Sequence, residues 1–206
     1  LAAAVFPAIV PSSVFGANAP SNRVAIGCIG TGGMGMADLR AFQAQPQAQI
    51  VAVCDVDSAR LKSAQSEAKL PDQRAYGDFR ELLEQSDIDA VTVVTPDHWH
   101  VPISIAAAKA GKDIYCEKPL SLTIAEGRTL ADTVHRYGRI LQTGSQQRSD
   151  LKFRRACELV QNGLIGELHT MHAEIPPNNR FSPAEWQVEP VPAGFDYEMW
   201  LGPAPW

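Results

Sequence analysis

An apolar run that leads directly into a glycine-rich turn constrains this chain more than any other feature. Residues 24–29 are followed by G-T-G-G-M-G, which places the spacing G-x-G-x-x-G on three glycines. In such a turn the first glycine permits a tight bend, the second lets a pyrophosphate approach the backbone, and the third lets the next helix pack closely. The pattern predicts a strand, a dinucleotide-binding loop and a helix; a turn that serves packing alone is the alternative. The candidate cofactor-binding residues of the loop are Gly30, Thr31, Gly32, Gly33, Met34 and Gly35.

The second apolar run ends in an acidic residue where folds of this kind hold a ribose. Asp55 closes the run at 50–55 and lies 20 positions after Gly35. A carboxylate there accepts hydrogen bonds from both ribose hydroxyls and repels a 2′-phosphate. The sequence therefore predicts NAD as the cofactor in preference to NADP. Asp57 is the weaker acidic candidate, since it precedes a predicted helix and suits a helix cap.

Strand-type and helix-type segments alternate through the middle of the chain. The strands are almost continuously apolar, which indicates burial on both faces and hence a parallel sheet covered by helices. The predicted strands are 24–29, 50–55, 74–76, 90–94, 113–116 and 140–142, and the predicted helices are 33–44, 58–68, 79–85, 101–110 and 124–137. Asp78 with Glu81 and Thr123 with Glu126 have capping-box spacing, and Gly111 and Gly138 suit helix C-caps. The predicted fold class is α/β, a Rossmann doubly wound parallel sheet over 21–145 followed by the start of an α+β second domain over 146–206.

Two polar clusters follow predicted strands, at the edge where open parallel sheets bind ligands. The first is T-P-D-H-W-H at 95–100, and the second is E-K-P at 117–119. His98 and His100 lack a nearby Cys, Asp or Glu set that would complete a metal site, so we expect them to bond to backbone, and no metal is predicted. Lys118 stands between an acid and a proline that fixes backbone φ, so its direction is expected to be set. A surface ion pair with the neighbouring glutamate is the alternative.

Composition and charge indicate a sizeable core, argue against a nucleic-acid partner and predict free cysteines. Apolar residues make up 45% of the 206 residues, which suffices for a sizeable core. The formal charge is -5, and no Lys/Arg cluster is longer than two residues, so a nucleic-acid partner is not expected. The four cysteines lack metal-type spacing, and three lie in strand-like apolar runs. We therefore expect free thiols and no disulfide.

These segments together resemble the Gfo/Idh/MocA (glucose-fructose oxidoreductase and inositol dehydrogenase) family, particularly its exported bacterial members. The runs G-T-G-G-M-G, V-C-D-V-D, T-P-D-H-W-H and A-G-K-D-I-Y-C-E-K-P-L carry the resemblance, which covers roughly residues 22–175. It implies that the glycine loop and Asp55 hold NAD, and that a lysine reaches both substrate and nicotinamide. The further site residues that it implies are Thr95, Pro96 and His100 beside the cofactor cleft, Glu117 and Lys118 at the cofactor, and Lys118 as the catalytic residue.

The resemblance also implies a reaction and its partners. The expected activity is NAD-dependent oxidation of a secondary hydroxyl of a sugar, glycoside or cyclitol, in a homo-oligomer formed through the second domain. One alternative is an NAD-retaining enzyme that cleaves glycosides by transient oxidation and elimination. Another is a nucleotide-binding module without catalysis.

One departure from the family pattern concerns the acid/base residue. Family dehydrogenases usually carry a D-x-x-x-H or related pair on the second domain, and the histidine acts as acid/base. In this chain the second domain would start with a helix at 153–161 and the run 166–175. After residue 150 the chain offers His169 and His172, and neither follows an aspartate at that spacing. We expect both to be ordinary strand residues and the acid/base residue to lie beyond Trp206, unless the chain cannot complete the reaction.

The two ends of the chain have unusual compositions. Residues 1–20 are apolar, are interrupted by Pro7 and Pro11 and end near A-N-A at 17–19, which predicts the remnant of an export signal and no membrane anchor. A periplasmic protein exported by the twin-arginine route is expected; if these residues are a disordered leader, the location is cytoplasmic. Residues 176–206 are rich in proline and tryptophan, so we expect them to pack on a surface and the natural polypeptide to continue.

Overall fold

The computed structural model describes residues 22–175 and 187–205. Contacts divide the chain into two units, one that runs to Gly144 and resumes at Ala193, and a second over Ser145–Pro192. The predicted export-signal remnant lies outside the described residues. No helix within the described ranges is both long enough and apolar enough to span a bilayer.

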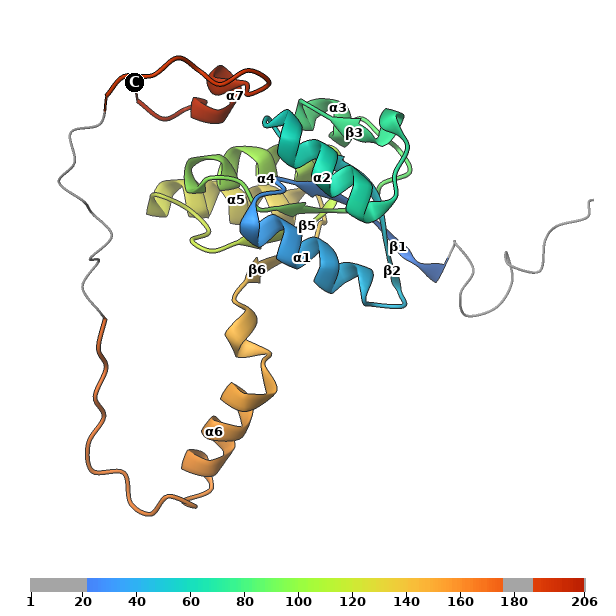
Figure 1. The fold of residues 1–206 in the computed structure, drawn as a ribbon. Coiled ribbons are helices and arrows are strands. Elements are labelled where there is room, and N and C mark those ends of the chain that lie inside the picture. Colours follow the sequence, from blue (N-terminus) through green and yellow to red (C-terminus); the bar gives the residue numbers. More distant parts are fainter. Residues whose placement is uncertain (1–21, 176–186, 206) are drawn as a thin grey trace, which may run out of the picture. The chain divides into compact units, whose positions relative to one another are not determined.

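The first unit is built on a six-stranded sheet with the order β3-β2-β1-β4-β5-β6 (Figure 1). Every pairing between neighbouring strands is parallel. The strands are β1 (Val24–Ile29), β2 (Ala48–Cys54), β3 (Ala75–Tyr76), β4 (Ala90–Val93), β5 (Asp113–Glu117) and β6 (Leu141–Gly144). The strand order reverses between β1 and β4, and a parallel sheet binds ligands beyond its carboxyl ends at such a point. The predicted Rossmann fold class is confirmed.

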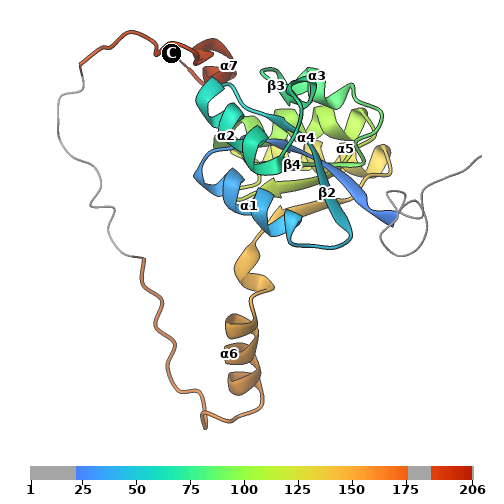
Figure 2. The ribbon, with the colours of Figure 1, turned by 45° about the vertical axis from the view of Figure 1, so that its right-hand side comes forward.

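Helices connect the strands and cover both faces of the sheet (Figure 2). The helices are α1 (Gly33–Gln43), α2 (Ser58–Ala68), α3 (Phe79–Leu83), α4 (His100–Lys109), α5 (Ile124–Arg136), α6 (Leu151–Gln161) and α7 (Tyr197–Leu201), with short 3₁₀ turns at Asp72–Arg74, Asp97–Trp99 and Gln146–Arg148. One buried cluster joins β1 and β2 to α1 through Leu39 and to α2 through Ala64. A second cluster joins the sheet to α3 through Leu82 and to α4 through Ile103 and Ala107. The core therefore lies in two layers, one on each side of the sheet.

Local sequence signals set most helix ends of this unit. Thr123 and Glu126 form the reciprocal capping box predicted at the start of α5. The side chain of Asp57 accepts hydrogen bonds from two backbone N–H groups at the start of α2. Asp78 accepts one from the Arg80 N–H at the start of α3, so it caps that helix without the reciprocal bond from Glu81 that its spacing suggested. Gly111 adopts a φ of 78°, as expected for a glycine that ends a helix.

The later residues differ from the prediction in two places. Helix α6 begins two residues before the expected start at 153, because Asp150 caps it by accepting a hydrogen bond from the Lys152 N–H. The run 166–175, which includes His169 and His172, forms no strand, so the expectation that both histidines are strand residues is wrong. A strand needs a hydrogen-bonded neighbour, and the described residues supply none for this run.

The proline-rich and tryptophan-rich end contains an element that the sequence did not predict. Helix α7 starts where the side chain of Asp196 accepts a hydrogen bond from the Met199 N–H. Leu201 is buried, so this part of the segment packs on a surface, as expected. Contacts group these residues with the first unit, whereas the sequence placed them in the second domain.

Candidate functional site

The loop between β1 and α1 has the close backbone approaches that glycine allows. Gly30 adopts a φ of 83°, and a Cβ atom there would lie 2.5 Å from the Val94 carbonyl oxygen. A Cβ atom on Gly35 would lie 2.0 Å from the carbonyl oxygen of Gly30. Neither position has room for a side chain, because both neighbouring atoms belong to the backbone. The first and last glycines of the motif are therefore required by this turn, as predicted.

The start of α1 is open to an anion. The first-turn N–H groups of a helix have no partner within the helix. Gly32 at the N-cap supplies no side-chain hydrogen bond, and the first turn of α1 contains no acidic residue, whereas α2, α3 and α5 are capped by side chains. A Cβ atom on Gly33 would meet nothing within 4 Å. Free N–H donors, the positive end of the helix dipole and open space suit a pyrophosphate.

Asp55 directly follows β2 and is held against the glycine loop. Its Oδ2 accepts hydrogen bonds from the Thr31 N–H at 2.7 Å and from the Thr31 hydroxyl at 2.9 Å. Its Oδ1 accepts one from the Asp57 N–H at 2.9 Å. A carboxylate offers about four acceptor positions, so one remains on Oδ1. Asp55 therefore orients the glycine loop and keeps one acceptor position for a hydrogen bond from a ribose hydroxyl.

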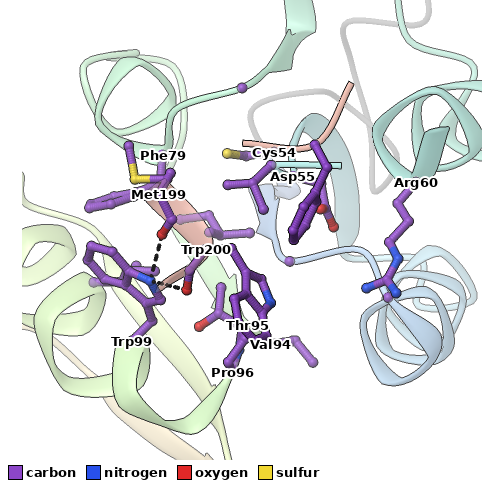
Figure 3. Close-up of a pocket in the computed structure, with 17 residues that line it drawn as sticks. Cys54, Asp55, Arg60, Phe79, Val94, Thr95, Pro96, Trp99, Met199 and Trp200 are labelled. Carbon is purple, nitrogen blue, oxygen red and sulfur yellow. Dashed lines mark hydrogen bonds between the residues drawn. The ribbon is translucent and has the colours of Figure 1, made fainter. Parts of the chain in front are cut away.

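A pocket of about 250 Å³ opens beside the loop, at the ends of β1, β2 and β4 (Figure 3). Trp99 and Met199 lie on one side of it, and Asp55 and Arg60 lie on the other. The hydroxyl oxygen of Thr95 is buried and has no hydrogen-bond partner among the described residues. A buried hydroxyl without a partner is costly, so this group is suited to bind a polar atom of a ligand.

The second predicted cluster lies at the end of β5, where His100 connects two strand ends. His100 is 1% exposed. Its Nδ1 lies 2.7 Å from the Pro119 carbonyl oxygen, and its Nε2 lies 2.9 Å from the Thr95 carbonyl oxygen. The expected backbone bonding of this histidine is confirmed, and the ring holds the E-K-P segment against the end of β4. Glu117 is buried, while Lys118 is exposed.

The structure brings part of the predicted set into the pocket. Five predicted residues line it: Gly30, Gly32, Asp55, Thr95 and Pro96. The others lie outside its lining: Thr31, Gly33, Met34, Gly35, His100, Glu117 and Lys118. Among the lining residues that the sequence did not single out are Arg60, Phe79, Trp99, Phe195, Met199 and Trp200. Trp99 belongs to a recognised motif, but nothing in the sequence predicted that residues near 200 would reach this edge.

All four cysteines are free, as expected, and three are buried. Burial raises the pKa of the Cys28 thiol to about 12 and that of the Cys116 thiol to about 11. The pKa of Cys54 is raised by burial as well, and the nearby Asp55 carboxylate adds to the shift. These thiols stay protonated at neutral pH and act as packing groups. Among the described residues, no cluster of three or more His, Cys, Asp or Glu side chains has the arrangement of a metal site.

Comparison with known proteins agrees with this geometry. Residues 24–145 match the family described as the Gfo/Idh/MocA oxidoreductase family with an NAD-binding Rossmann fold. The myo-inositol 2-dehydrogenase of Thermotoga maritima is 36% identical over 146 residues, which are 71% of this chain and 43% of the relative. The scyllo-inositol dehydrogenase of Lactobacillus casei, solved with NAD(H) and scyllo-inositol, is 28% identical with a TM-score of 0.64, over 70% of this chain and 43% of that one.

A third similar structure is a 3-ketoreductase from Actinomadura kijaniata, solved in complex with TDP-benzene and NADP. It is 25% identical with a TM-score of 0.66, over 71% of this chain and 46% of that one. The chain thus spans less than half the length of these relatives. The glycine loop, the parallel sheet and the family match over residues 24–145 agree, and the chain belongs to the Gfo/Idh/MocA family of oxidoreductases with an NAD-binding Rossmann fold.

Proposed function

We propose that this chain carries the cofactor half of an NAD-dependent dehydrogenase that oxidises a secondary hydroxyl of a cyclitol or related sugar. The observation that carries the proposal is the pocket at the switch point of the sheet, where the uncapped start of α1, Asp55 and the unpartnered Thr95 hydroxyl converge. The inositol dehydrogenases among the relatives support the substrate class.

NAD is proposed in preference to NADP because of the charge at the ribose end of the pocket. The Asp55 carboxylate would repel a 2′-phosphate. Arg60 also lines the pocket and is the cation that could attract such a phosphate. However, its Nε lies 3.5 Å from the Asp57 carboxylate, which offsets part of its charge. Asp55 and Asp57 together therefore favour a ribose with a free 2′-hydroxyl, as in NAD, over one that carries a 2′-phosphate, as in NADP.

Lys118 is the proposed catalytic residue. Bound NAD supplies the acceptor for the hydride that leaves the substrate carbon. Lys118 follows β5, next to β4 and its Thr95-Pro96 end in the sheet order, and its side chain is exposed. Its Nζ can donate a hydrogen bond to the substrate oxygen as that oxygen develops alkoxide charge, while the hydroxyl proton would leave to the acid/base group that members of the family carry on the second domain. His100 positions this segment, since its Nδ1 lies 2.7 Å from the Pro119 carbonyl oxygen.

The direct test is the substitution Lys118→Met in the natural gene product, assayed by NADH absorbance with myo-inositol, scyllo-inositol and a panel of monosaccharides. Turnover should fall by about a hundredfold to a thousandfold, in the range of a lost transition-state donor, while NAD affinity stays within twofold. Lys109→Met is the matched control, because Lys109 is an exposed lysine in the last turn of α4. Turnover of the Lys118 variant equal to that of the control would refute the assignment.

The alternatives are distinguished in the same assay. An enzyme that oxidises its substrate transiently and eliminates a glycoside would cleave glycosides with no net NADH, and a module without catalysis would bind NAD and do neither. The names of the relatives favour net oxidation. We also propose that the protein is exported to the periplasm and forms a homo-oligomer through its second domain. N-terminal sequencing of the mature protein and its mass in solution test these two points, and a mature start well before residue 17 would contradict signal cleavage.

A further inference from the structure

Residues 193–204, here called the aromatic clasp, return to the carboxyl edge of the sheet after the whole second unit has intervened. The Asp196 N–H donates a hydrogen bond to the Val56 carbonyl oxygen at 2.9 Å. The Ser58 N–H donates one to the Gly194 carbonyl oxygen, also at 2.9 Å. Backbone pairing thus joins the first half of the clasp to the turn that follows Asp55.

The second half of the clasp is held by the cluster that follows β4. The Trp99 Nε1–H donates to the carbonyl oxygens of Met199 and Trp200, with N···O distances of 2.9 Å and 3.2 Å. His98 Nε2 lies 3.0 Å from the same Trp200 oxygen. A Cβ atom on Gly202 would lie 2.2 Å from the Trp99 indole, which shows how closely the chain passes over this ring. The clasp is therefore anchored at both ends to segments that border the pocket.

The clasp supplies aromatic surface to the pocket. Phe195, Tyr197 and Trp200 form a ring cluster with centroid separations of 5.8 to 6.4 Å. Phe195 and Trp200 line the same cavity as Asp55. Figure 3 shows Trp200 together with Thr95 and Pro96 between the Trp99 side and the Asp55 side of the pocket. An aromatic wall beside a ribose-binding carboxylate has the chemistry of a nucleoside site.

The position of the pocket in the sheet indicates which half of a dinucleotide it takes. Its lining comes from the ends of β2, β1 and β4, whereas Lys118 follows β5 and does not line it. Its volume of about 250 Å³ is below the roughly 300–1,000 Å³ typical of small-molecule sites. The volume indicates that the pocket holds less than a whole dinucleotide, and its lining beside Asp55 and away from Lys118 assigns it the adenosine half. The nicotinamide half would extend toward Lys118.

We propose that the aromatic clasp forms one wall of the adenosine site, with Trp200 stacking on the adenine ring and Phe195 closing the ribose side. This inference rests on the proposed NAD-binding function. It assigns cofactor-binding residues to a segment far from the glycine loop in sequence. It also predicts that NAD contacts the aromatic clasp through its adenosine half and not through its nicotinamide half.

Titration calorimetry of the 206-residue chain with NAD, ADP-ribose and nicotinamide mononucleotide tests the proposal. Trp200→Ala should weaken NAD and ADP-ribose by about tenfold, within the range measured for bases that stack on aromatic side chains. It should leave nicotinamide mononucleotide unchanged, and Trp200→Phe should restore most of the affinity. Gly202→Val should give the same loss, because its side chain would displace the clasp from Trp99.

Tyr137→Ala is the matched control, because Tyr137 is an exposed aromatic residue beyond the end of α5. Equal or tighter binding of ADP-ribose by Trp200→Ala, relative to this control, overturns the clasp proposal while NAD binding stands. A wild-type chain that binds neither NAD nor ADP-ribose overturns the proposed function, and the clasp proposal fails with it. Circular dichroism of each variant shows whether the sheet remains folded, and a loss shared by Trp200→Ala and the folded Gly202→Val variant supports the proposal.

Discussion

The substitution Gly35→Ala tests whether the tight turn after β1 is needed for the fold itself. The new Cβ atom would lie 2.0 Å from the Gly30 carbonyl oxygen and 2.9 Å from its carbon. Since Cβ atoms essentially never approach other atoms within 3.0 Å, the loop and helix α1 must separate by about 1 Å (3.0 minus 2.0). The obstructing atoms are backbone, so no side-chain rotation relieves the clash. Overpacking of this kind costs about 1–3 kcal/mol of the free energy of unfolding.

Gly33→Ala is the matched control for this experiment. Its Cβ atom would meet nothing within 4 Å, and alanine stabilises a helical position by up to about 1 kcal/mol over glycine. Urea unfolding followed by circular dichroism should therefore rank Gly33→Ala at or above wild type and Gly35→Ala below it, a separation of about 1–4 kcal/mol. Midpoints that agree within about 0.5 kcal/mol would refute the reasoning about the turn.

Three further outcomes follow from the same structure. Asp55→Ser removes the negative charge at the ribose end of the pocket, so the ratio of NADP to NAD affinity should rise by about tenfold or more in a fluorescence titration; an unchanged ratio would contradict the role of the carboxylate. His100→Ala removes a buried ring that contacts the carbonyl oxygens of Thr95 and Pro119, and it should lower the free energy of unfolding by about 2–4 kcal/mol in urea; a loss below about 1 kcal/mol would show that the histidine does not hold these strand ends. Because burial raises the pKa of Cys28 to about 12 and Cys157 is exposed, a disulfide reagent at pH 8 should modify one thiol per folded chain and four after unfolding; rapid reaction of two or more thiols in the folded protein would contradict the burial.

The parts of the fold that the sequence predicted depend on local signals. The strand before Gly30, the cap at Asp57 and the capping box at Thr123 each involve residues close together in the chain, and the structure shows all of them. The position of Asp55 at the end of β2 was predicted by its spacing from the glycines. Its hydrogen bonds to Thr31 were not, because they depend on how closely the loop approaches β2.

The parts that the sequence did not predict depend on contacts between distant segments. The run 166–175 has a strand-like composition, yet a strand forms only where a partner strand is available. Helix α7 and the pocket residues Phe195 and Trp200 acquire their place from hydrogen bonds to Val56, Ser58 and Trp99, more than 90 residues earlier. Composition indicated that this tryptophan-rich segment would pack on a surface, but no local pattern could identify which surface.

The most direct test of the central claim is a calorimetric titration of the chain with NAD and, separately, with NADP. The account predicts saturable binding of one NAD per chain and weaker binding of NADP, because it proposes that the uncapped start of α1 binds the pyrophosphate and that Asp55 repels a 2′-phosphate. Tighter binding of NADP would contradict the assignment of Asp55. The absence of saturable binding by both dinucleotides would contradict the claim that this pocket is a cofactor site.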